Sequence, residues 1–175
     1  MKDELMELKA RVESLDVIRK KLRGLEAHFV GIFHQVDVFF NVSRGRLKLR
    51  RVEEEEEAKL IYYERENILG PKKSNVIILS IHEPELAMML FENILGKKIV
   101  IDKKREIYIY KGTQIHLDIV KNLGKFIEFE RKIKDFTKDQ KILEDLAIKL
   151  GIKDKDRLKG SYSDIALESE RESTI

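Results

Sequence analysis

The chain has 175 residues, which is enough for a single domain with an ample hydrophobic core. Its 35 Lys and Arg nearly balance its 32 Asp and Glu, so the net charge of +3 argues against bulk nucleic-acid binding, and any anion site must come from local segregation of charge. The absence of Cys, of an apolar run long enough to span a bilayer and of a signal-peptide pattern predicts a cytoplasmic protein without membrane partners, and the high Lys and Glu content resembles that of thermophilic proteins.

The first half of the chain predicts strands in which charged and apolar residues alternate. The expected elements are a strand over 4–12, a helix over 15–23 capped by Ser14, one or two strands over 27–41, a strand over 46–50, an acidic loop over 53–57 and a return strand over 59–65. The 46–50 segment alternates cation and leucine without a break, so Arg46, Lys48 and Arg50 share one strand face and Leu47 and Leu49 share the other.

The second half predicts more strands of this kind between two helices. The expected elements are a loop over 70–74, strands over 75–80, 97–110, 113–120 and 125–133, a helix over 84–95 that begins at Pro84, and a helix over 138–150 with a capping box of Thr137 and Gln140. In the 84–95 helix the residues expected to face the core are Leu86, Met89, Leu90 and Ile94. We expect one domain over 1–165 and a flexible tail over 166–175.

About eight strands joined mostly by short turns, with three amphipathic helices, indicate antiparallel pairing in an α+β fold. If the apolar strand faces form an ordinary core, the charges simply face water. The alternative is a closed eight-stranded barrel whose outer apolar face is covered by the helices and whose charged face lines the interior, which then has room for one small ligand. Periodicity alone does not distinguish the two arrangements.

The residue types on the charged faces suit a metal-bound chain of phosphates. Cations occur at Lys48, Arg50, Lys103 and Arg105, and carboxylates occur at Glu7, Asp118, Glu128 and Glu130. Carboxylates are ligands of Mg²⁺ and Mn²⁺, which typically share their coordination with substrate phosphates. The chain has no Walker loop and no Gly-rich dinucleotide turn, and its four His show no metal-ligand spacing. His116 is in phase with Asp118, where a structural role is about as plausible as a catalytic one.

Several motifs, in the same order along nearly the whole chain, resemble those of the CYTH family of triphosphate tunnel enzymes. The matching pieces are MELKARV, HQVDVFFNVSRGRLKLR, LIYYER, the Lys103–Arg105 strand, IHLDIVKNLGKFIEFE and SYSDI, which are closest to the class IV adenylyl cyclase-like branch, itself related to thiamine triphosphatase. The resemblance implies a closed antiparallel eight-stranded barrel, a triphosphate tunnel, with helices outside. It implies phosphate binding by Lys9, Lys48, Arg50, Arg65, Lys103 and Arg105. It implies Mg²⁺ or Mn²⁺ binding by Glu7, Asp118, Glu128 and Glu130, and catalytic roles for Glu7, Lys9, Glu128 and Glu130.

One departure from the family bears on activity. The family signature is E-x-E-x-K, and alignment on Lys9 places Leu5 where the first Glu would stand, because Glu4 lies on the opposite strand face and Asp3 lies about 7 Å further along the strand. The leading hypothesis is a class IV adenylyl cyclase that converts ATP to cyclic AMP and pyrophosphate. The alternatives are a triphosphatase acting on inorganic triphosphate, thiamine triphosphate or a nucleotide, a binding module without turnover, and an outward-facing nucleic-acid binder. A homodimer is compatible with all of them.

Overall fold

The computed structural model of the chain describes residues 1–172 and forms one closed barrel. The strands are β1 (Lys2–Arg11), β2 (His28–Phe40), β3 (Arg46–Val52), β4 (Ala58–Arg65), β5 (Lys72–Ile81), β6 (Lys97–Tyr110), β7 (Thr113–Val120) and β8 (Gly124–Lys132). The helices are α1 (Leu15–Gly24), α2 (Pro84–Leu95), α3 (Phe136–Leu150) and α4 (Tyr162–Glu172), with a short 3₁₀ turn at Asp154–Asp156. None of the helices in the described part of the chain has the length and apolar character needed to cross a bilayer.

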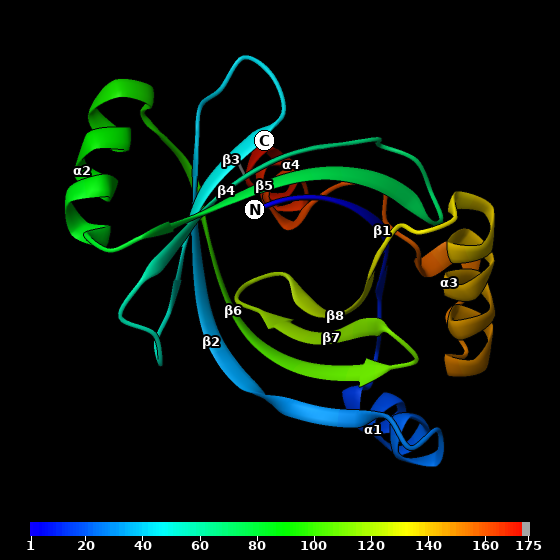
Figure 1. Cartoon of the computed structure of the whole chain (residues 1–175). Helices are drawn as coiled ribbons and strands as arrows, with labels where there is room; N and C mark the ends of the chain where they lie inside the picture. Colours follow the sequence, from blue (N-terminus) through cyan, green and yellow to red (C-terminus); the bar gives the residue numbers. More distant parts are fainter. Residues whose placement is uncertain (173–175) are drawn as a thin grey trace.

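The eight strands close in the order β1-β5-β4-β3-β2-β6-β7-β8, and every neighbouring pair is antiparallel (Figure 1). This confirms the predicted α+β fold with a closed eight-stranded barrel. Side chains alternate along each strand, so each strand sends one set of residues into the barrel and the other set outward.

The outward sets are the apolar ones, and helices cover them on two sides of the barrel. Strand residues such as Leu8, Leu117 and Phe129 form a core with α1 and α3. Leu49 and Leu47 lie in a second core under α2, as the 46–50 pattern predicted for the barrel arrangement. The charged strand faces therefore line the interior, which decides between the two arrangements that periodicity left open.

Helix α4 packs against residues of the barrel interior. Its first residue, Tyr162, is 5% exposed and its ring lies 4.9 Å from that of Phe126, while Ile165 and Leu167 pack on the same interior cluster. Arg46 of β3 anchors the helix through Asp164, with Nη2 of the arginine 2.7 Å from the carboxylate. Residues 166–172 of the expected tail belong to this helix, and its remaining residues 173–175 lie outside the described residues.

Two further predictions of local structure were wrong at their boundaries. β5 begins at Lys72 within the expected 70–74 loop, because residues 72–74 pair with residues 5–7 of β1. Helix α3 begins two residues earlier than expected, because the Asp135 carboxylate accepts from the backbone N–H of Lys138 at 3.1 Å and caps the helix.

The expected core-facing stripe of α2 was also wrong. Leu86, Met89, Leu90 and Ile94 are between 51% and 66% exposed, and the residues packed on the barrel are Ala87, Met88, Phe91 and Leu95. The helix is apolar on almost every side, so the 3.6-residue period fits either face equally well.

Candidate functional site

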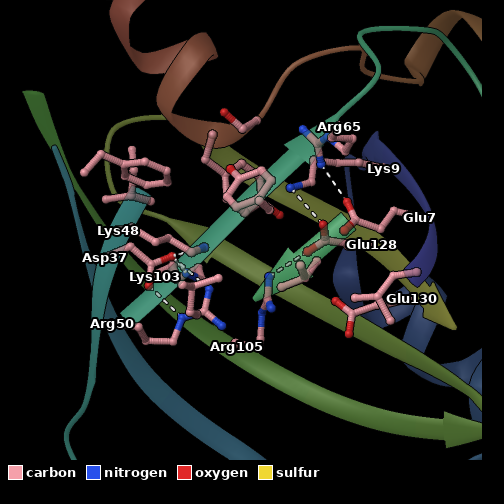
Figure 2. Close-up of a pocket in the computed structure, with 18 of the residues that line it drawn as sticks. Glu7, Lys9, Asp37, Lys48, Arg50, Arg65, Lys103, Arg105, Glu128 and Glu130 are labelled. Atoms are coloured by element: carbon pink, nitrogen blue, oxygen red, sulfur yellow. Dashed lines mark hydrogen bonds and ion pairs between the residues drawn. The ribbon is translucent and has the colours of Figure 1, made fainter. Parts of the chain in front are cut away.

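A cavity inside the barrel is lined by charged side chains from six of the eight strands. Its volume is about 140 Å³, which corresponds to about ten water-sized spheres and is on the order of the size of a triphosphate group. The cations that line it are Lys9, Lys48, Arg50, Arg65, Lys103 and Arg105 (Figure 2). The carboxylates that line it are Glu7, Asp37, Glu128 and Glu130. The cavity is therefore lined by six basic side chains and four carboxylates.

Asp37 of β2 holds three of these cations in one cluster. Its carboxylate accepts from Lys48 at 2.9 Å, from Arg50 at 2.6 and 2.9 Å, and from Lys103 at 2.7 Å. Burial by itself would raise the pKa of Asp37, but the charges of Arg50 and Lys103 outweigh it and hold the pKa well below its usual range. Asp37 therefore stays ionised and acts as the internal counter-ion of the cluster.

The lysines of this cluster are poised to respond to an added anion. Burial, together with the charge of Arg50, lowers the pKa of Lys48 to about 8 despite Asp37. Burial also lowers the pKa of Lys103 well below its usual range, and Arg50 and Arg105 lower it further. A phosphate entering the cluster would favour the charged form of both lysines.

A second cluster lies further along the cavity around Glu128 of β8. Arg105 donates to Glu128 at 2.8 Å, and the Lys9 ammonium lies 3.1 Å from its other oxygen. Arg65 donates Nη1–H to Glu7 at 2.7 Å, while its Nε and Nη2 are buried without a protein partner within residues 1–172. Buried guanidinium donors are costly when unpaired, and a phosphate oxygen is a suitable acceptor for them.

Asp118 is not exposed to the cavity, which separates it from the other predicted metal ligands. It is 0% exposed and its two oxygens accept from Nε and Nη2 of Arg105, both at 2.7 Å. One of them also accepts from the Tyr162 hydroxyl at 2.6 Å. Asp118 thus orients the Arg105 guanidinium from behind, and Tyr162 connects this pair to α4.

Carboxylates meet at the β1–β8 side of the cavity. Glu7 and Glu130 are directly paired across the two strands, and burial with the charges of Glu7 and Glu128 raises the pKa of Glu130 to about 7. Among the described residues no three His, Cys, Asp or Glu side chains converge to form a complete metal-binding group. The donor set nevertheless fits Mg²⁺ or Mn²⁺, because these ions need only one or two protein carboxylates when a substrate phosphate supplies further oxygens.

Next to these carboxylates, Leu5 stands at the position where the E-x-E-x-K signature has its first Glu. Its side chain gives the cavity an apolar wall there. It is 8% exposed and faces the cavity beside Val76 and Ile78. Neither acidic neighbour takes its place, since Asp3 pairs with Lys132 at 2.9 Å and Glu4 pairs with Lys73 at 2.6 Å. Beyond this wall the interior continues into a second hollow of about 380 Å³, which Leu5, Val76, Ile78 and Glu130 also line.

The structure brings together nine of the ten predicted site residues around one cavity, and it adds others that the sequence patterns did not single out. Asp37 was in phase with its neighbours Gln35 and Phe39, and that alternation was the available signal. Tyr162 gave no periodic signal, although its ring lies 3.7 Å from the Lys9 ammonium. His116 is buried, which together with the charge of Arg105 lowers its pKa, so it is neutral near pH 7.

Three comparisons with known proteins agree with this geometry. The CYTH domain profile matches residues 5–162. A Methanocaldococcus jannaschii protein named "Putative adenylate cyclase MJ0240" is 28% identical over 152 residues, which cover 81% of this chain and 84% of that protein. The structure of the PH1012 protein from Pyrococcus horikoshii is 28% identical and superposes with a TM-score of 0.82 over 94% of this chain and 98% of that one.

A more distant structure shows the fold alone. It is that of a Hippeastrum protein named "Putative adenylyl cyclase HpAC1", whose description gives it a dominant triphosphatase activity. It is 15% identical, with a TM-score of 0.63 over 93% of this chain and 94% of that one.

Proposed function

Because the chain belongs to the CYTH domain family, we propose that it is a divalent-metal-dependent enzyme that binds a triphosphate inside its barrel and cyclises ATP to cyclic AMP and pyrophosphate. The observation that carries the proposal is the excess of basic side chains over carboxylates around one cavity whose volume is on the order of that of a triphosphate. Buried charges are costly unless they are compensated, and a polyanion would compensate them.

The cations of the two clusters would divide the phosphates between them. Arg50, Lys48 and Lys103 would bind one part of the chain in exchange for their contacts with Asp37. The buried Nε and Nη2 of Arg65 would bind another phosphate, with Lys9 and Arg105 between. Such fixed donors stabilise the charge that moves onto the pyrophosphate leaving group.

The carboxylates would serve proton transfer and cation binding. In the reaction the ribose 3′-oxygen forms a bond to the α-phosphorus, the bond from that phosphorus to the bridging oxygen breaks, and pyrophosphate leaves. Glu130, with a pKa near 7, suits acceptance of the 3′-hydroxyl proton. Glu7 and Glu128 would bind Mg²⁺ or Mn²⁺ together with the phosphates, and the ion supplies Lewis-acid polarisation and charge neutralisation.

A specific observation supports each of the other candidates. The cavity beside the cations is only on the order of the size of a triphosphate, which favours a triphosphatase acting on inorganic triphosphate, thiamine triphosphate or a nucleotide. The apolar wall at Leu5, with the hollow beyond it, instead favours a substrate that carries an organic group. Leu5 also favours a binding module without turnover, because the site has one carboxylate fewer than the E-x-E-x-K signature would give it.

Product analysis separates these candidates. The protein is incubated with ATP, inorganic triphosphate or thiamine triphosphate in Mg²⁺ and in Mn²⁺, and the products are resolved by chromatography. Cyclic AMP with an equal amount of pyrophosphate supports the proposal, and release of orthophosphate without cyclic product contradicts it in favour of the triphosphatase. Glu128→Ala should abolish turnover, whereas Glu64→Ala, whose carboxylate pairs with Arg44 outside the cavity, should leave it unchanged.

A further inference from the structure

Helix α2 carries apolar side chains on the side that faces away from the barrel. Figure 1 shows it standing apart from α1, α3 and α4, on its own side of the barrel. Its inner side packs on the barrel, where Phe91 lies 5.5 Å from Phe40 between ring centroids. The outer side presents Leu86, Met89, Leu90 and Ile94, exposed by 52%, 56%, 51% and 66%. A helix that is apolar on both sides is typical of one that is buried on both sides.

The apolar surface continues from α2 onto the sheet at both flanks. A single row of cross-strand neighbours runs around the barrel through Val100, Val38, Leu49, Leu60 and Leu79. Val38 and Leu49, in the middle of the row, are 6% and 0% exposed beneath the helix. The two ends, Val100 and Leu79, are 45% and 52% exposed. Helix α2 thus covers the centre of an apolar belt that is wider than the helix itself.

The charges at the two ends of α2 indicate what covers this surface. Glu83 lies at the beginning of the helix and Lys98 lies three residues after its end, whereas the neighbouring Glu85 and Lys97 are paired within the subunit with Arg51 and Glu92. A second copy of the helix in antiparallel orientation would place the acidic end of each copy beside the basic end of the other. It would also align the two helix dipoles favourably and bring the same apolar stripe into contact with itself, as a twofold interface requires.

We propose that the protein is a homodimer in which α2 of one subunit packs antiparallel against α2 of the other, with the Leu86, Met89, Leu90 and Ile94 stripe at its centre. Val100 and Leu79 lie at the edge of the contact. The exposed helix and belt are then the two halves of an apolar interface, and each barrel keeps its own complete cavity. This proposal is independent of the reaction that the cavity catalyses.

Sedimentation equilibrium of the full chain over a concentration series tests the proposal. The expected result is a monomer–dimer equilibrium that Leu90→Glu weakens at least tenfold, because the substitution places two like charges at the centre of the contact. Ile148→Glu is the matched control: Ile148 on α3 is 71% exposed and the same change there should leave the equilibrium unchanged. Circular dichroism checks that each variant keeps its fold.

A charge exchange tests the orientation of the two helices. Glu83→Lys alone and Lys98→Glu alone should each weaken the dimer, and the double variant should restore it, because the opposite charges again face each other across the interface. A protein that is monomeric at all concentrations overturns the proposal. A different interface is also possible to detect with Ile119→Glu, which changes the outer face of β7. If the dimer resists Leu90→Glu but dissociates with Ile119→Glu, the interface lies at β7 and the proposal that it lies at α2 is overturned. Single and double exchange variants that dimerise equally overturn the antiparallel orientation.

Discussion

Glu130→Gln should stabilise the protein at alkaline pH and leave it unchanged at acidic pH. The pKa of Glu130 is raised from 4.5 to about 7 by burial and by Glu7 and Glu128. Between these values the folded protein keeps a proton that the unfolded chain releases, so stability falls as pH rises through this window and the full cost is present above pH 7. At 1.36 kcal/mol per pKa unit the cost is about 3 kcal/mol, as an upper value, and glutamine removes it.

Urea unfolding of the wild type and the variant at several pH values between 4.5 and 8.5 measures this effect. The gain in the free energy of unfolding should grow from near zero at pH 4.5 to about 2–3 kcal/mol at pH 8. Glu128→Gln is the matched control two residues away, where the charges of Lys9 and Arg105 hold the pKa well below its usual range against the effect of burial. It should destabilise the protein at pH 8. A gain for Glu130→Gln that does not vary with pH would refute the reasoning.

Three further predictions follow from the same cavity. Asp37→Asn leaves three buried cations without their counter-ion and should cost about 3–5 kcal/mol of unfolding free energy, measured by urea unfolding, with inorganic triphosphate restoring more stability to the variant than to the wild type. Equal stabilisation of both would count against the proposed exchange of Asp37 for phosphate. Calorimetric titration should show triphosphate affinity falling as pH rises above about 8, where Lys48 loses its charge, and this contribution should vanish in Lys48→Arg. Tyr162→Phe loses the hydrogen bond to Asp118 and should lower the denaturation midpoint by an amount equivalent to about 2 kcal/mol, with a result below 0.5 kcal/mol contradicting that bond.

The alternation of charged and apolar residues was enough to predict most strands and the residues that share each charged face. A strand period of two places Lys48 and Arg50 on one face, and the same rule applied to the other strands predicts their inward residues. Periodicity does not say whether the charged face points inward or outward, so the barrel arrangement needed the additional evidence of family motifs. The structure resolves this through the helices that cover the leucine face.

Other features depend on partners that are distant in the sequence. Asp118 lies in phase with the site residues, but its carboxylate is taken by Arg105 and Tyr162, and only the folded geometry reveals that competition. Tyr162 itself enters the interior from a segment without a periodic pattern. The outward stripe of α2 was assigned to the core because a helix that is apolar on both sides gives no signal of which side faces the barrel.

The most direct test of the triphosphate cavity is a crystal structure of the protein with a non-hydrolysable ATP analogue and Mn²⁺, recorded at a wavelength where manganese scatters anomalously. The account predicts phosphate density in contact with Arg50, Arg65 and Arg105, and an anomalous peak beside Glu7 and Glu128. Phosphate density only on the outer surface, or an empty barrel at saturating ligand, would contradict it.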